Sequence, residues 1–336
     1  MRRSPKRSQL LVQGAAAWFA FAILPRPSRA AQFEFKLASS DAVELPATVR
    51  FVQMANAVKA ETDGRMQINV FPNSQLGSQT AMLGQLRLGS IQMLNLQHSA
   101  YSSVVPVAQI SSLGFAFTSD KMGLEALDGP LGAYVRREFA AKGLYAFRRS
   151  SLSGFRNVTS STKPIHAAED FTGFRLRVIA AAIFVDLFKA LGASPTPLDA
   201  NELYTALQTH LVDGQEGILQ LIDSFRLFEV QRYLSLTNHI WSGEWLVANA
   251  DAWSRLPSDI RDIVERNIDK HILSSRRDQV LLNNALPDKL RREGLTFNST
   301  DTASMRARLA PYYTRWRAEF GSTAWTLLTD KVGKLV

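Results

Sequence analysis

The sequence contains no cysteine among its 336 residues. Disulfide bonds, thiolate nucleophiles and cysteine-based zinc or iron-sulfur sites are therefore excluded. Histidine is also scarce: the five histidines have no metal-ligand spacing. The chain has no phosphate-cradling glycine loop, dinucleotide fingerprint or nucleophile elbow. We therefore expect no metal site, no cofactor and no enzymatic activity.

A hydrophobic run long enough to span a membrane is missing too. The longest apolar stretch, residues 10–24, is shorter than the ~20 residues that a transmembrane helix needs. Four cations precede it, and the small residues Ser28 and Ala30 follow it. This order is typical of an export signal. We predict a signal peptide over residues 1–30, cleaved near Ala30, and a periplasmic mature protein; an uncleaved N-terminal anchor is the alternative.

The predicted mature chain has little excess charge of either sign. The whole sequence carries a formal net charge of +9, with 39 basic and 30 acidic residues. Residues 1–30 hold six of the basic residues and none of the acidic ones, so the remainder carries 33 basic and 30 acidic residues. A nucleic-acid partner is therefore not predicted.

The succession of helix and strand patterns predicts an α/β fold. The first half favours strands and helices in alternation, with strands over 32–38, 66–71 and 91–96 and helices over 46–62 and 78–88. This order is typical of a mainly parallel sheet with helices on its faces. The pattern restarts after Gly143, with strands over 144–147, 154–158 and 174–178, helices over 181–191 and 201–209, and a short strand over 234–237.

Two further helical patterns end the sequence, one from about 257 to 283 or beyond and one over 302–320. The length suits two domains of roughly 150 residues each. We predict a two-lobe, periplasmic binding protein-like α/β fold with hinge strands between the lobes. Lobe I would comprise residues 31–153 and about 243–281, and lobe II residues 154–242 and about 282–336.

Arginines on the predicted strands are the main candidates for ligand contacts. Strand alternation places Arg175 and Arg177 on one face and Leu176 and Val178 on the other. Arg156 lies on the strand that precedes them in the sequence. The planar guanidinium offers a fork of donors that fits a carboxylate, so this pattern favours an acidic ligand held in a cleft. Solvated surface arginines are the alternative.

Other candidates are polar or aromatic residues near strand ends. Asp213 and Glu216 lie three residues apart in a predicted loop that fixes no carboxyl separation, so we interpret them as a turn former and a surface carboxylate. Gln97 follows the third strand, where ligands bind in α/β folds. Trp241 is a candidate for the wall of a cleft, with ordinary core packing as the alternative.

Five stretches carry a family resemblance, at residues 71–77, 85–89, 173–178, 208–216 and 236–239. In order and spacing they resemble the solute receptors of tripartite ATP-independent periplasmic (TRAP) transporters, of the dicarboxylate-binding DctP type. The resemblance extends from about residue 33 to about residue 320. It implies two α/β lobes, crossing strands, a long helix spanning both lobes, and closure around a small organic acid that integral-membrane transporter subunits then receive.

The resemblance also implies roles for individual residues. Arg177 matches the family arginine that pairs with the substrate carboxylate, and Arg156 matches an assisting position. Gln215 belongs to the matching Asp-Gly-Gln-Glu core and is a candidate contact. Gly217 replaces the asparagine common in the family, which removes a donor and opens space for a bulkier acid. The alternatives to a transport receptor are an exported enzyme acting on an organic acid and a ligand-sensing module for a membrane kinase.

Overall fold

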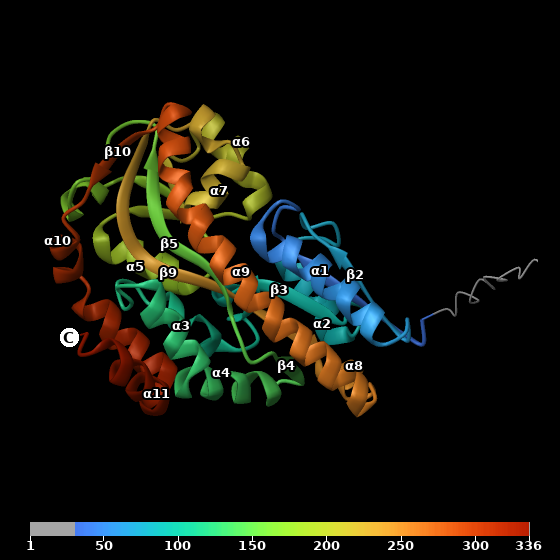
Figure 1. Ribbon diagram of the computed structural model, residues 1–336. Helices are drawn as coiled ribbons and strands as arrows, with labels where there is room; N and C mark the ends of the chain where they lie inside the picture. The colour runs from blue at the N-terminus through green and yellow to red at the C-terminus, as the bar shows by residue number, and fades with distance from the viewer. Residues whose placement is uncertain (1–30, 336) are drawn as a thin grey trace, which may run out of the picture.

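The computed structural model describes residues 31–335 (Figure 1). The predicted signal peptide, residues 1–30, lies outside the described residues. The strands are β1 (Phe33–Ser39), β2 (Met66–Phe71), β3 (Met93–Gln97), β4 (Leu144–Ala146), β5 (Ser151–Ser160), β6 (Arg175–Val178), β7 (Ser194–Pro197), β8 (Gly214–Ile218), β9 (Tyr233–Asn249) and β10 (Thr296–Ser299). The helices are α1 (Pro46–Glu61), α2 (Gln79–Leu88), α3 (Asp120–Asp128), α4 (Pro130–Ala140), α5 (Ala182–Leu191), α6 (Leu203–Gln208), α7 (Leu219–Ser224), α8 (Ala250–Ser254), α9 (Ser258–Arg292), α10 (Thr302–Ala307) and α11 (Ala310–Val332).

One mixed sheet connects the two halves of the molecule, in the strand order β2-β1-β3-β9-β5-β8-β6-β7. On one side, β1 pairs in parallel with β2 and β3. On the other, β6 pairs in parallel with β7 and β8. Each parallel group, with the helices around it, forms one α/β unit, as the sequence pattern predicts.

Two antiparallel strands cross between these units. The C-terminal part of β9 pairs with β3 and β4, whereas its N-terminal part pairs with β10. Strand β5 pairs with β9 along its length and with β8 through its second half. Because both strands belong to both units, they are the covalent crossings that the sequence predicts as hinge strands.

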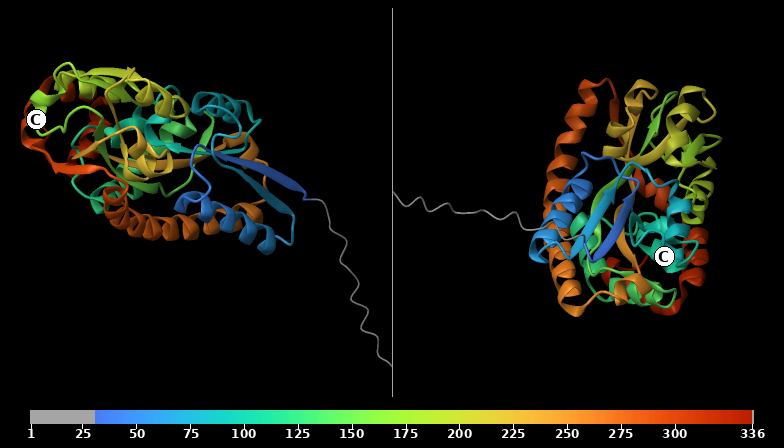
Figure 2. Two further views of the ribbon diagram at one scale, coloured as in Figure 1. Left: turned by 90° about the horizontal axis from the view of Figure 1, so that it is seen from above. Right: turned by 90° about the vertical axis from the view of Figure 1, so that its right-hand side faces the viewer.

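The 35-residue helix α9 runs across both units on one side of the sheet, as Figures 1 and 2 show. It contacts α1 of the first unit, the crossing strand β5, and α7 of the second unit. Arg276 fastens its middle, because its guanidinium donates to both carboxylate oxygens of Asp128 at 2.7 and 2.8 Å and to the carbonyl of Ser150. The predicted long helix is therefore present.

Local signals explain the helix that begins beside the cavity described below. The hydroxyl of Ser78 accepts a hydrogen bond from the Ala81 amide and caps the start of α2. Gly89 ends the helix in the left-handed conformation, with φ of 77°. Met82, Leu83 and Leu86 are buried, and Gln79, on the same face at the first turn, is half-buried and lines the cavity.

Three expectations from the sequence differ from the structure. Strand β9 extends to Asn249 rather than ending at 237, because it is buried on both faces and therefore lacks the apolar and polar alternation of a half-exposed strand. The short helices α3 and α4 were not predicted. The last helical pattern is divided into α10 and α11, because Pro311, which lacks an amide hydrogen, stands in the first turn of a new helix.

Candidate functional site

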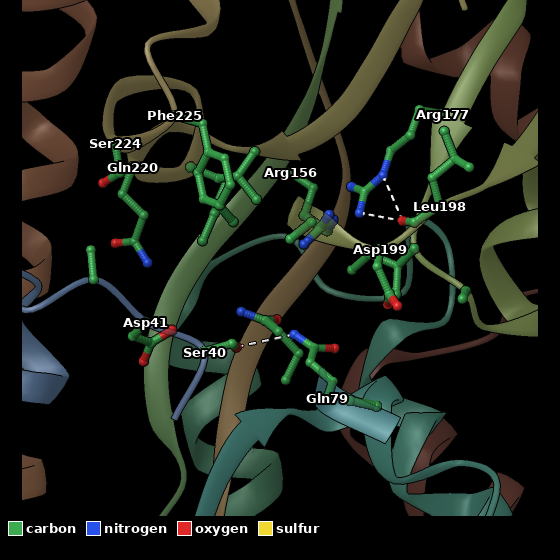
Figure 3. A pocket seen from close by; sticks show the side chains of 18 of the residues that line it. Ser40, Asp41, Gln79, Arg156, Arg177, Leu198, Asp199, Gln220, Ser224 and Phe225 are labelled. Carbon is green, nitrogen blue, oxygen red and sulfur yellow. Dashed lines mark hydrogen bonds between the residues drawn. The ribbon is translucent and has the colours of Figure 1, made fainter. Parts of the chain in front are cut away.

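A cavity lies between the two units, where loops follow the carboxyl ends of parallel strands from both sides (Figure 3). The first unit contributes residues after β1 and β3 and at the start of α2, and the second contributes residues after β6, β7 and β8. Ligands of α/β proteins bind at such strand ends. The polar and charged residues that line it are Ser40, Asp41, Gln79, Thr80, Gln97, Arg156, Arg177, Asp199, Gln220 and Ser224.

Arg177 lies on β6 and lines this cavity with only 2% of its surface exposed. Its Nε and Nη2 donate to the carbonyl oxygen of Leu198 at 3.0 and 2.6 Å, which fixes the plane of the guanidinium (Figure 3). Its Nη1 is buried and has no hydrogen-bond partner among the described residues. Burial lowers the pKa of Arg177 to about 10 despite the opposing charge of Glu216, so the group remains a cation at neutral pH.

Arg156 lies on the crossing strand β5 and also lines the cavity. Its Nε donates to Glu216 Oε2 at 2.5 Å and its Nη2 to Oε1 at 2.9 Å. The aromatic ring of Phe184 lies beneath the guanidinium, 5.2 Å from Cζ. Arg156 therefore has its charge matched inside the protein by Glu216, whereas Arg177 forms no ion pair within residues 31–335.

Glu216 is fully buried, so its interpretation as a surface carboxylate is wrong. It lies on β8, where its carboxylate accepts from Arg156 and lies 3.3 Å from Nε2 of His239. Burial alone would raise the pKa of Glu216, but the charge of Arg156 and the hydrogen bonds from His239 and Arg156 lower it to about 2. The sequence could not show this, because its partner arginine lies 60 residues away.

Arg175 has the environment of an ordinary surface arginine. It is exposed and pairs with Asp213, although it lies only two residues from Arg177 on the same strand. Between and beyond them, Leu176 and Val178 are fully buried in the core, as the alternation predicts. Of the three strand arginines, the structure therefore brings Arg156 and Arg177 to one cavity and leaves Arg175 outside its lining.

Gln97 is the third predicted candidate that lines the cavity. It is the last residue of β3, and its Nε2 donates to Glu244 Oε1 at 3.2 Å and to the hydroxyl of Ser153 at 3.3 Å. The neighbouring His98 lies in a 3-10 turn in the core, where its ring nitrogens lie 2.7 and 2.8 Å from the hydroxyls of Ser111 and Ser150. Burial lowers the pKa of His98 to about 3.

The remaining candidates are not among the residues that line the cavity. Gln215 is fully buried on β8, where its Nε2 donates to Thr159 and its Oε1 has no partner within the described part of the chain. A Cβ atom at Gly217 would lie 2.9 Å from that Oε1 and 3.3 Å from Leu221, so the space beside this glycine is occupied. Trp241 packs in the core and donates to Asp120 at 3.0 Å.

Several cavity residues were not predicted from the sequence. Asp41 follows β1, Leu198 and Asp199 follow β7, and Phe225 directly follows α7. The rule that selected Gln97, a polar residue at the carboxyl end of a parallel strand, would also have selected Asp41. The carbonyl of Leu198 has no such signal, because its role depends on the fold of the backbone.

The geometry suits capture of an anion rather than a bond-breaking step. A buried guanidinium with one unsatisfied nitrogen is stabilised by an acceptor that enters the cavity, and a carboxylate is the matching acceptor. In residues 31–335 no cluster of three or more histidine, aspartate or glutamate side chains has the arrangement to hold a metal ion. No helix in the same range is both long and apolar enough to cross a bilayer.

Comparisons with known proteins agree on one family. The model of DctP, described as bacterial extracellular solute-binding protein, family 7, matches residues 38–319. The protein y4mM of Sinorhizobium fredii is 34% identical over 265 residues, which are 78% of this chain but 49% of that relative, so the chain spans about half its length. The sialic acid-binding periplasmic protein SiaP of Vibrio cholerae is 28% identical over 80% of this chain and 83% of its own.

A solved structure has the same fold over nearly all of the described chain. It is a TRAP periplasmic solute-binding protein from Sulfitobacter sp. NAS-14.1 with bound β-D-galacturonate. The TM-score is 0.85 at 25% identity, and the match covers 90% of this chain and 100% of that one. The predicted two-lobe binding-protein fold is confirmed by this match.

Proposed function

The chain belongs to the DctP family of bacterial extracellular solute-binding proteins, and from this premise we propose that it binds a carboxylate-bearing solute between its lobes, with Arg177 as the main anion contact. Proteins of this family are TRAP solute-binding receptors and not enzymes. Two relatives bind sialic acid and galacturonate, and both of these ligands carry a carboxylate.

The unpartnered Nη1 of Arg177 is the observation that carries this proposal. The carbonyl of Leu198 holds the other two nitrogens, so a solute carboxylate would meet a guanidinium that is already oriented. Arg156 would assist through its charge and position, and Gln97 would contribute an amide from the opposite lobe. Gln215 would support Arg177 from the neighbouring strand, because the two residues are register partners on β8 and β6.

A second part of the proposal concerns closure and delivery. Lobe I would comprise residues 31–153 and about 243–281, and lobe II residues 154–242 and about 282–336, with β5 and β9 as the hinge. A solute that contacts both lobes favours the closed state by its differential affinity for that state. The closed receptor would then dock on integral-membrane TRAP subunits. Export through a signal peptide cleaved near Ala30 would bring it to the periplasm.

The test is a thermal-shift and calorimetric screen of the protein purified from the periplasm, unfolded and refolded to remove bound solute. We expect organic acids to raise the melting temperature, because a ligand at about 100 times its Kd adds ~2.7 kcal/mol to stability. Arg177→Ala should lose about 2 to 5 kcal/mol of binding free energy, or roughly 30-fold to several thousand-fold in affinity.

The matched control is Arg175→Ala, which removes an exposed arginine from the same strand. It should leave the affinity within about twofold of the wild type, because a surface ion pair contributes little. Equal affinities for Arg177→Ala and the wild type would overturn the role of Arg177 as the anion contact.

A further inference from the structure

A carboxyl group lies on the cavity wall that faces the arginines. Asp41 follows β1 and lines the cavity, and Figure 3 shows it with Ser40 and Gln79 on the far side of the space from Arg177. The amide of Gln79 donates to the hydroxyl of Ser40 at 3.0 Å, which gives this wall a fixed polar surface. The cavity thus has two arginines on the side of the second unit and a carboxyl group on the side of the first.

Asp41 is backed by a second, fully enclosed carboxyl group. Glu244 on β9 is 3% exposed, and Asn95 Nδ2 lies between the two acids, 2.6 Å from Glu244 Oε2 and 3.4 Å from Asp41 Oδ2. Gln97 donates to the other oxygen of Glu244 at 3.2 Å. The side chains of Asn95 and Gln97 are neutral amides. They donate hydrogen bonds to the carboxyl oxygens but do not neutralise the negative charge of the two acids.

Electrostatics divides the roles of the two acids. Burial raises the pKa of both carboxyls, and the nearby charge of Asp41 raises the pKa of Glu244 further. Two adjacent carboxyls in such a site share one proton. The hydrogen bond between the two carboxyls lowers the pKa of Asp41 and raises that of Glu244, which favours the proton on the enclosed Glu244 and the negative charge on the cavity-lining Asp41.

The other charges of the lining do not compensate Asp41. Arg156 is neutralised by Glu216, and Asp199 on the arginine side adds a second negative charge. Arg177 is the cation left for a solute carboxylate, through a nitrogen that is itself buried and unpartnered among the described residues. A second solute carboxylate at the Asp41 end would therefore meet like charge, whereas a hydroxyl or ammonium group would meet an acceptor.

Resting on the proposed function, we propose that Asp41 determines specificity at this end of the cavity. It selects an acid whose far end carries a hydrogen-bond donor, either hydroxyl or ammonium, and it disfavours a dicarboxylate. Asn95 and Glu244 are positioning residues, because they hold Asp41 from behind and do not line the cavity.

Four acids with four carbons each isolate the chemistry of the far end. Butanoate has no group there, succinate has a carboxylate, 4-hydroxybutanoate has a hydroxyl and 4-aminobutanoate has an ammonium group. By calorimetry, we expect 4-hydroxybutanoate or 4-aminobutanoate to bind the wild type about 10- to 100-fold more tightly than succinate and butanoate, as a charge-assisted hydrogen bond would provide. If the hydroxyl-bearing acid binds more tightly than 4-aminobutanoate, the far end of the solute carries a hydroxyl group. The reverse order indicates an ammonium group.

Variants test whether Asp41 causes this preference. Asp41→Asn should remove the advantage of the donor-bearing acid and leave butanoate unchanged, while Glu244→Gln, which keeps the Asp41 charge, should preserve the wild-type order. Tightest binding of succinate by the wild type, or an unchanged preference in Asp41→Asn, would overturn the assignment. Arg177→Ala separates the two proposals: if it abolishes binding of every acid while Asp41→Asn alters none of their ratios, the proposed function stands and the inference about Asp41 fails.

Discussion

Glu216 and Arg156 form a two-pronged ion pair in the protein interior, with N–O distances of 2.5 and 2.9 Å and side-chain exposures of 0% and 1%. The pair connects the crossing strand β5 to β8 of the second unit. It fixes Arg156 beside the cavity and cancels its charge. The cation that remains available to a solute carboxylate is therefore Arg177, which lies on the next strand, β6.

The first prediction concerns this ion pair. Glu216→Gln should lower the free energy of unfolding by about 3 to 5 kcal/mol, because it leaves the guanidinium of Arg156 buried without a counter-charge. Urea denaturation of the solute-free protein measures this loss. The control is Asp213→Asn, three residues earlier, whose partner Arg175 is exposed, and it should cost less than about 1 kcal/mol.

A double variant tests whether the lost stability comes from the unpaired charge of Arg156. Arg156→Met combined with Glu216→Leu removes both charges and should recover most of the stability lost in Glu216→Gln. A loss in Glu216→Gln no larger than that of Asp213→Asn would contradict the idea that burial makes this pair sensitive.

The second prediction is a pH dependence from His98. Its folded-state pKa of about 3 lies below its ordinary value of 6.5, so the folded protein keeps the ring neutral while the unfolded chain takes up a proton. The stability from this difference is complete above pH 6.5 and is lost as the pH falls from 6.5 towards 3, with a slope of at most about 1.4 kcal/mol per pH unit.

His98→Gln should reduce the fall in unfolding free energy between pH 7.5 and pH 5.0, while His166→Gln, at an exposed position, should leave it unchanged. Chemical denaturation at the two pH values gives the comparison. An identical fall in the wild type and in His98→Gln would exclude the buried ring as its source.

The sequence predicts the parallel strands of the first unit well, because their signals are local, but of the parallel strands of the second unit it predicts only β6 and not β7 or β8. The first unit has five elements in the predicted order, and α2 ends at Gly89 as expected. The crossing strand β9 was predicted far too short, since its burial on both faces depends on α/β units that are distant in the sequence. Local sequence patterns therefore predict the first unit better than the crossing strand that connects the two units.

The same distinction between local and long-range features holds for the residues of the candidate site. Strand alternation and residue type nominate Arg175 as readily as Arg177, and it is the family resemblance that singles out Arg177 and Arg156. The burial of Glu216 and the contact between Arg177 and Leu198 are invisible there, because each joins residues that only the fold brings together. Asp41 is an intermediate case, since its place at a strand end is predictable but its enclosed partner Glu244 is not.

The third prediction tests how tightly α9 holds the hinge. Gly154 on β5 has φ of 107°, and a Cβ atom there would lie 2.4 Å from Asn283 Nδ2 of α9. That nitrogen donates to the carbonyl of Ser153 at 3.1 Å. Gly154→Ala should therefore incur both backbone strain and the loss of this hydrogen bond. Gly294, with φ of 103° and no atom within 4 Å of its Cβ position, provides a comparison with a similar φ and no obstruction.

We expect Gly294→Ala to cost about 1 to 2 kcal/mol of unfolding free energy and Gly154→Ala about 1 kcal/mol more, since a hydrogen bond contributes about that amount. In an Asn283→Ala background, the cost of Gly154→Ala should fall to about that of Gly294→Ala, because the obstructing side chain is gone. Equal costs for the two glycine variants in the wild-type background would mean that the side chain of Asn283 moves aside without loss of stability. Helix α9 would then not restrain β5 at the point where the chain crosses between the lobes.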